Sequence, residues 1–106
     1  MTEKPARPVY TLVVEVGRSE HDGLPENATG AGLLCYCAGI SEEEAVNETV
    51  AVLREAGMNP LEVEGLGTAE ELAADGHSIM AYELALMERA RSDNAVIVAQ
   101  TTLFND

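Results

Sequence analysis

The chain has 106 residues and a formal net charge of −13, from 19 acidic and 6 basic residues. A chain of this length has room for one domain with a modest core. Its negative field repels nucleic acid and anionic lipid, and six cations are too few for a phosphate-binding stripe. We therefore expect one domain over residues 1–106 with a loose N-terminal arm at 1–8, and neither nucleic acid nor a membrane as partner.

The cysteines and the apolar runs bear on location. No apolar run approaches the roughly 20 residues of a membrane span, and the polar start of the chain does not resemble a signal peptide. Cys35 and Cys37 are the only cysteines and lie two residues apart in an apolar run. Thiols in this arrangement are typical of a reduced protein, so the sequence predicts a cytoplasmic location.

The first third of the chain predicts two strands joined by a long loop. β-branched residues dominate 9–16, and Gly17 follows, which is typical of a strand that ends in a turn. The stretch 18–32 is polar and rich in glycine, which predicts a loop that is functional or mobile. Residues 33–38 are apolar on both faces and predict a central strand.

A helix follows, and its start is marked by a capping signature. Ser41 precedes Glu44 by three residues, which is the spacing of a capping box. Val46, Val50 and Leu53 recur at helical spacing and predict the buried side of this helix. Gly57 suits its C-terminal cap.

The last third predicts a strand, a helical region and a final strand. Residues 61–64 alternate between apolar and acidic, as a half-exposed strand does. A second capping box at Thr68 and Glu71 starts a helix, which 75–78 interrupt before the helical pattern resumes over 79–91. One kinked helix or two pieces both fit this pattern. Residues 95–99 predict a buried strand, and an extension through Phe104 is left open.

These elements predict an α+β fold: a single two-layer domain in β-β-α-β-α-β order. Two β-α-β crossovers after an antiparallel first strand give a four-stranded mixed sheet with two helices on one face. The other face is then uncovered and partly apolar, and such a surface commonly self-associates. We therefore expect a homo-oligomer. Candidates for the uncovered surface are Thr11, Val13, Cys35, Cys37, Leu61 and Val63.

A family resemblance is carried by the segment 33–56, about a quarter of the chain. It consists of an apolar strand, Gly39, and a helix with an acidic first turn that carries Ala45 and Ala56. In this plan the chain resembles the α+β domain in the C-terminal half of the tubulin and FtsZ family, and also chorismate-mutase-like trimers. The resemblance implies an assembly or ligand-binding module without GTPase activity, because the glycine-rich nucleotide loop of FtsZ-like proteins has no counterpart here.

The loop at 18–32 holds the candidate ligand-binding residues. Together they offer imidazole, carboxylate, amide and hydroxyl groups in a glycine-rich setting, which suits a hard cation or a small polar ligand. Their spacing does not match an EF-hand, and a solvated connector is the alternative. The candidates are His21, Asp22, Glu26, Asn27 and Thr29.

The two cysteines are the other chemical candidates. On a strand they share one face with Cα atoms roughly 6.5 Å apart, so a disulfide between them needs a distorted strand. A zinc site needs about four ligands, and only His21 and His77 could complete it. Packing thiols are the alternative, and we expect neither a metal site nor a cofactor.

The sequence therefore predicts a non-catalytic module that oligomerises or binds a ligand or protein. No nucleophile elbow, Walker sequence or HExxH motif is present. Two alternatives remain. One is a small enzyme with a site at a subunit interface, built from loop residues such as His21 or Glu26. The other is a metal-binding regulator that uses Cys35 and Cys37.

Overall fold

The computed structural model describes residues 8–105. The expected arm at 1–8 lies outside this range except for Pro8, whose carbonyl accepts a hydrogen bond from the Gly39 N–H. Within the described range no helix is long and apolar enough to span a bilayer. The elements are β1 (Val9–Gly17), β2 (Gly30–Ala38), α1 (Glu42–Glu55), β3 (Asn59–Thr68), α2 (Ala69–Ala74), α3 (Ala81–Ser92) and β4 (Ile97–Phe104).

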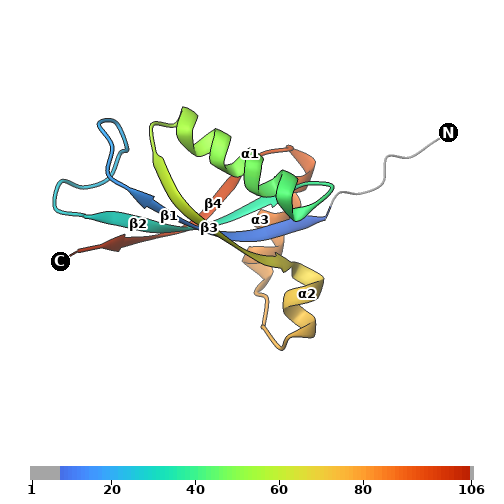
Figure 1. Ribbon diagram of the computed structural model, residues 1–106. Helices are drawn as coiled ribbons and strands as arrows, with labels where there is room; N and C mark the ends of the chain where they lie inside the picture. The colour runs from blue at the N-terminus through green and yellow to red at the C-terminus, as the bar shows by residue number, and fades with distance from the viewer. Residues whose placement is uncertain (1–7, 106) are drawn as a thin grey trace.

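The four strands form one twisted sheet in the order β3-β1-β2-β4, with β3 and β4 at its edges (Figure 1). Every neighbouring pair is antiparallel. The expected α+β class and strand count agree with this, but the β-β-α-β-α-β order and the mixed sheet are wrong. Residues 8–105 form three helices, and the strands that α1 joins run in the same direction without being neighbours. β1 lies between β2 and β3 and pairs with both, so no parallel pair forms.

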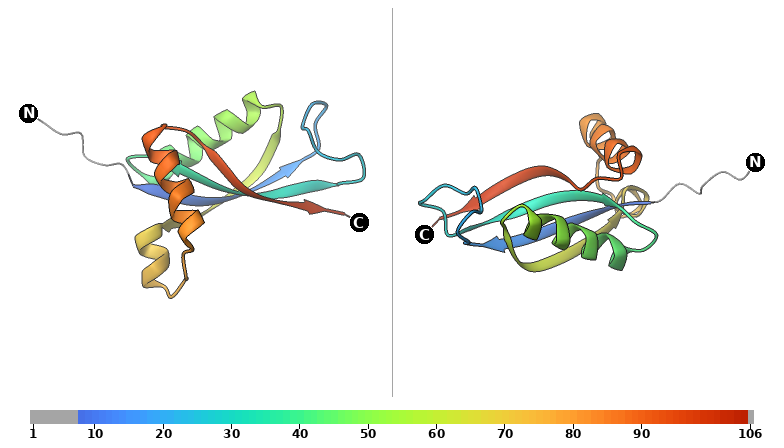
Figure 2. Two further views of the ribbon diagram at one scale, coloured as in Figure 1. Left: turned by 180° about the vertical axis from the view of Figure 1, so that it is seen from behind. Right: turned by 90° about the horizontal axis from the view of Figure 1, so that it is seen from above.

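The helices cover both faces of the sheet, which corrects the expectation that they share one. Figure 2 shows α1 on one side and α2 with α3 on the other. We call these sides the α1 face and the α3 face. On the α1 face, β1 and β2 form a buried core with the helix residues Ala45 and Leu53. On the α3 face, Tyr36 packs with Met87 and Ala90 in a smaller cluster.

The register of β1 against β2 also corrects the expected uncovered surface. Leu12 lies opposite Cys35, so these two side chains share the α1 face. Cys35 and Cys37 are therefore buried under α1, and Val63 packs against the same core. Thr11 projects to the opposite, α3 face because side chains alternate along a strand.

α1 begins at the expected residue. The Glu44 N–H donates to Ser41 Oγ at 3.2 Å, while the Glu44 carboxylate accepts from the Ile40 N–H rather than from Ser41. Three glutamates in the first turn and Arg54 in the last complement the helix dipole. The buried residues are Ala45, Thr49 and Leu53. Val46 and Val50 are only half-buried, so the buried stripe is turned by one position from the expected one.

The region after β3 consists of two helices, which resolves the alternative between one kinked helix and two pieces. The capping box of Thr68 and Glu71 is confirmed: each accepts a hydrogen bond from the backbone of the other. α2 has no buried residue, and Asp75 is its C-cap. α3 starts after Met80, and its inner side carries Met87 and Ala90.

Candidate functional site

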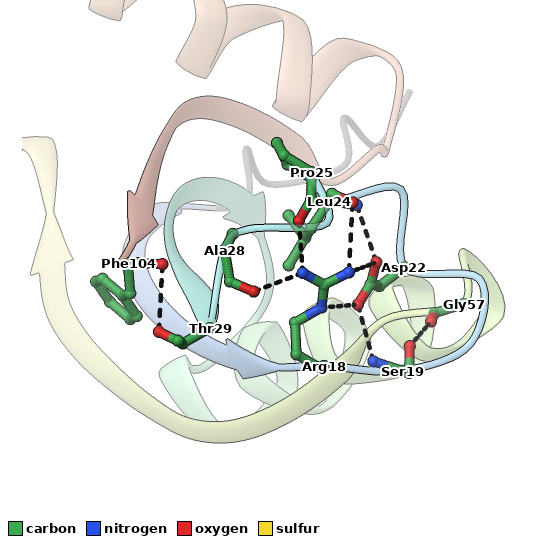
Figure 3. A network of polar contacts seen from close by, with 9 residues as sticks. All are labelled: Arg18, Ser19, Asp22, Leu24, Pro25, Ala28, Thr29, Gly57 and Phe104. Atoms are coloured by element: carbon green, nitrogen blue, oxygen red, sulfur yellow. Dashed lines mark hydrogen bonds and ion pairs between the residues drawn. The ribbon is translucent and has the colours of Figure 1, made fainter. Parts of the chain in front are cut away.

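The loop between β1 and β2, residues 18–29, is organised around the Arg18 guanidinium (Figure 3). Its Nε donates to the Asp22 carboxylate at 3.0 Å, and its Nη1 donates to the carbonyls of Pro25 and Ala28, each at 2.5 Å. A guanidinium presents five donors in a rigid fork, so one side chain can hold several loop carbonyls at once. Arg18 thus gives this polar segment a defined shape.

Asp22 is the acidic partner in this network and is buried. Its carboxylate accepts from the backbone N–H groups of Ser19 at 2.8 Å and Leu24 at 2.9 Å. These two bonds, in that order, and then the charge of Arg18 lower the pKa of Asp22 below its ordinary value of 3.8. Because backbone and guanidinium donors engage both oxygens, Asp22 braces the loop and offers little to a ligand.

The other four candidate ligand-binding residues do not gather around Asp22. The side chains of His21, Glu26 and Asn27 are exposed. The hydroxyl of Thr29 donates to the Phe104 carbonyl at 3.2 Å and so ties the loop to the end of β4. Among the described residues, no group of three histidine, cysteine or acidic side chains could hold a metal ion. Binding of a small ligand by the exposed residues of the loop stays a prediction.

The two cysteines are free thiols buried on the α1 face. Burial, with the neighbouring Cys37 as the second cause, raises the pKa of Cys35 to about 12. Burial also raises the pKa of Cys37, against the opposing effect of the Thr49 hydroxyl. Metal ligation and nucleophilic attack both require the thiolate. These thiols therefore fit the packing role that the sequence offered as the alternative.

The two edges of the sheet differ in how they are protected. β3 carries Pro60, Glu62 and Glu64, and its pairing with β1 is broken by two register shifts. Proline, charges and bulges are the usual devices that prevent an edge strand from pairing with another chain. β4 has one register shift, after which Gln100–Phe104 continue in regular pairing with β2. This segment carries none of the three devices.

β4 also differs from the rest of the surface in charge and polarity. No charged residue lies between Asp93 and Asp106. The large apolar side chains Val98, Leu103 and Phe104 are 43%, 41% and 39% exposed. On the other side of the sheet, by contrast, Glu15 of β1 lies directly opposite Glu62 of the edge strand β3. The acidic surface of the sheet is therefore on its β3 side and the uncharged surface on its β4 side.

Sequence reasoning placed the last strand at 95–99 and left an extension through Phe104 open, so it did not identify this edge. The structure starts β4 at Ile97 and extends it through Phe104. The ring of Phe104 lies over Gly32, where an added Cβ would be 3.3 Å from the ring, so the glycine gives the aromatic side chain room to pack. The sequence does contain a signal for this strand, namely a run of uncharged residues near the end of a very acidic chain. The sequence does not show that this run forms an edge of the sheet, because that depends on the strand order.

Comparison with known proteins gives one match. Residues 9–105 match the model of a family described as Domain of unknown function (DUF8846). No curated protein and no solved structure matches the chain. The resemblance to the tubulin and FtsZ family and to chorismate-mutase-like trimers stays a prediction. The match extends from the first residue of β1 to the residue after β4, and the chain belongs to the DUF8846 family.

Proposed function

We propose that this chain is a non-catalytic, self-associating module whose unit is a homodimer joined at β4. In the dimer two β4 strands pair antiparallel across a twofold axis, and two four-stranded sheets become one continuous sheet. The observation that carries the proposal is an uncharged, unprotected edge strand in a chain of net charge −13. An unpaired strand edge is a template for pairing with another chain.

Charge favours β4 over every acidic surface as the contact. Two copies of this chain repel each other at long range, and carboxylates placed directly opposite one another across strands are destabilising. Pairing through β3 would bring Glu62 and Glu64 toward a second copy. Pairing through β4 brings no carboxylate of the strand into the contact and buries apolar area at Val98 and Leu103.

The symmetry of the contact limits the assembly to two copies. A twofold interface uses the same strand of each partner, so no free β4 edge remains for a third copy. The β3 edges stay outside and keep their protection. Since Thr29 fixes the 18–29 loop to the end of β4, the dimer would carry one loop at each end of the joined strands. The exposed His21, Glu26 and Asn27 would be available there to a further partner.

A cytoplasmic location belongs to the same proposal. Cys35 and Cys37 are free thiols, and both are buried on the α1 face. Free buried thiols suit a reducing compartment.

Sedimentation equilibrium of the wild-type chain and of two single variants tests the proposal. We expect the wild-type chain to be dimeric at tens of micromolar. Thr101→Glu should dimerise at least about tenfold more weakly, because each copy then brings a carboxylate into a contact between strands that has no cation to balance it. Leu61→Glu is the matched control: it adds the same charge on β3, where the side chain is 61% exposed. This variant should keep the wild-type dimer constant. A monomeric wild type, or equal dissociation of both variants, would overturn the proposal.

Salt dependence provides a second readout of the same contact. Added salt screens the repulsion between two acidic chains, since the Debye length falls from about 10 Å at 0.1 M to about 3 Å at 1 M. The β4 contact contains no ion pair to be weakened, so the dimer should become tighter with salt. A dimer that dissociates as salt is added would indicate an interface built on ion pairs and would contradict pairing through β4.

A further inference from the structure

A pocket lies on the α3 face, between the sheet and the chain that joins α2 to α3. Its volume of about 430 Å³ falls in the range of small-molecule sites, roughly 300–1,000 Å³. Strands β1, β2 and β3 form its floor, and α2, α3 and their connection form its walls. Most of the lining is apolar and is supplied by Leu34, Leu66, Leu72, Ile79 and Met87.

A β-bulge in β3 lies at one of these apolar side chains. Opposite β3, Thr11 pairs with Gly67 and Leu12 pairs with Gly65, so Leu66 is an extra residue without a partner. Gly67 has a φ of 99°, a conformation that favours glycine. Bulges redirect side chains and are over-represented next to binding sites. Leu66 lies at this bulge, on the α3 face, and lines the pocket.

A fixed tyrosine and glutamate pair forms the polar part of the pocket. The buried Tyr36 hydroxyl donates to Glu83 Oε2 at 3.1 Å, and the Met80 N–H donates to Glu83 Oε1 at 3.1 Å. Burial and the neighbouring Glu83 raise the pKa of Tyr36 to about 12, so the phenol keeps its proton. A carboxylate has about four lone-pair sites. Glu83 is therefore held in place by two donors and can accept further hydrogen bonds.

A second acceptor in the pocket is Thr11. Its side chain is 4% exposed, and its hydroxyl has no hydrogen-bond partner among the described residues. Buried polar atoms are nearly always hydrogen-bonded, and exceptions call for an explanation such as a missing ligand. A ligand donor that reaches Thr11 Oγ1 would satisfy it.

The charges of the lining decide the class of ligand. Glu83 and Asp75 are carboxylates, and the lining contains no lysine or arginine; His77 is its one basic side chain. An anionic ligand would meet carboxylates and no fixed cation, whereas an ammonium group would meet acceptors. We infer that the pocket binds a small primary amine with an aromatic or branched apolar body. The ammonium donates to Glu83, with Thr11 as a further acceptor, and the body packs on Leu34 and Leu66. This inference does not rest on pairing through β4.

Phenethylamine is the probe, and two analogues with the same ring serve as controls. Hydrocinnamate carries a carboxylate, and phenethyl alcohol carries an uncharged hydroxyl. In titrations of the ¹⁵N-labelled full chain, phenethylamine should shift the amide signals of Leu34, Leu66 and Glu83 with saturation. Hydrocinnamate should bind at least about tenfold more weakly. Equal binding of the amine and the carboxylate would overturn the inference.

Single variants test whether the amine binds in this pocket and how much the Thr11 hydroxyl contributes to its affinity. Leu66→Trp fills the pocket and should abolish the shifts, whereas Leu61→Trp, on the same strand but outside the pocket, should not change them. Thr11→Val keeps the side-chain shape and should weaken the amine about fivefold, as one lost hydrogen bond does. Retained binding in Leu66→Trp contradicts the site.

If Leu66→Trp does not fold, Glu83→Gln provides the test of amine binding in the pocket. Glutamine keeps an oxygen acceptor for the Met80 N–H but removes the charge. Phenethylamine should then lose at least about tenfold in affinity while phenethyl alcohol changes little, because only the ammonium depends on the carboxylate. Equal losses for both ligands would count against the amine.

Discussion

On the α1 face, Leu12, Val14 and Leu33 are fully buried beneath a helix of 14 residues. On the α3 face, the buried cluster contains only Tyr36, Met87 and Ala90. The same strands supply both faces, but side chains alternate along a strand, so each face has its own set of residues. The helices differ as well: α1 lies along the sheet, whereas α2 and α3 are two separate helices (Figure 2). The pocket lies between these two helices, their connection and the sheet.

This difference indicates a division of roles between the two faces. A face packed by one continuous helix buries the larger apolar cluster and so contributes more of the hydrophobic stabilisation. A face covered by two short elements has fewer packed contacts and keeps polar groups near a cavity. We expect stability to depend mainly on the α1 face and ligand binding on the α3 face. Four predictions test this comparison, from the largest expected effect to the smallest.

The largest effect is expected from a cavity on the α1 face. Leu33→Ala should lower the free energy of unfolding by about 3 kcal/mol, the usual cost of a fully buried leucine, measured by urea denaturation. Met87→Ala on the α3 face should cost about 2 kcal/mol because its cluster is smaller. Leu84→Ala, at a half-exposed position of α3, is the control and should change stability by less than about 0.5 kcal/mol. A larger cost for Met87→Ala than for Leu33→Ala would reverse the comparison.

Tyr36→Phe removes the main hydrogen bond of the α3 face. At neutral pH it should cost about 1 kcal/mol. The folded pKa of Tyr36, about 12, lies above its ordinary value of 10.0. The stability from the protonated phenol is therefore complete below pH 10 and is lost as pH rises through the folded value. Melting temperature followed against pH should fall less steeply in Tyr36→Phe than in wild type over this window; identical slopes would contradict the prediction.

Asp22→Asn tests the loop that is joined to the α1 side through the Ser19 hydroxyl and the Gly57 carbonyl. The pKa of Asp22 is lowered on folding, so its carboxylate stabilises the fold above pH 3.8 and loses this effect as pH falls through the folded pKa. The variant should be less stable at pH 7 and less sensitive to acid than wild type. Its binding of phenethylamine should be unchanged, because the loop does not line the pocket. Unchanged stability at pH 7 would show that the Asp22 network is dispensable.

The smallest effect is on cysteine reactivity. Cys35 has a pKa of about 12, and Cys37 also has a raised pKa. Both thiols should resist iodoacetamide at pH 8 in the native chain and react when urea unfolds it, as mass spectrometry can follow. Leu33→Ala, which opens the α1 face, should speed their alkylation more than Met87→Ala does. Rapid alkylation of the native wild type would show that the α1 face is not closed.

Some features follow from local sequence and could be predicted. The caps at Ser41 and Thr68 depend on side chains that bond to backbone three residues away, so spacing alone identifies them. The two central strands are clear for a similar reason: one is a β-branched run between Pro8 and Gly17, and the other is an apolar run between Gly32 and Gly39. The sequence predicts the boundaries of β3 and β4 less well, because the exposed positions of these edge strands weaken the alternation of apolar and polar residues.

The strand order, the faces and the sites required the tertiary structure. The sequence could not show that α1 crosses over β1 and connects β2 to the edge strand β3. Nor could it show that α2 and α3 then lead the chain back to the other edge, where β4 pairs with β2. That order decided which strand became the uncharged edge and put Cys35 under α1. It also brought Thr11, Leu66 and Glu83, from three separate elements, to one pocket. By itself the sequence determined an acidic α+β domain with its helix starts, because these depend on contacts between near neighbours. The arrangement depends on the register between strands distant in the chain, which local patterns do not encode.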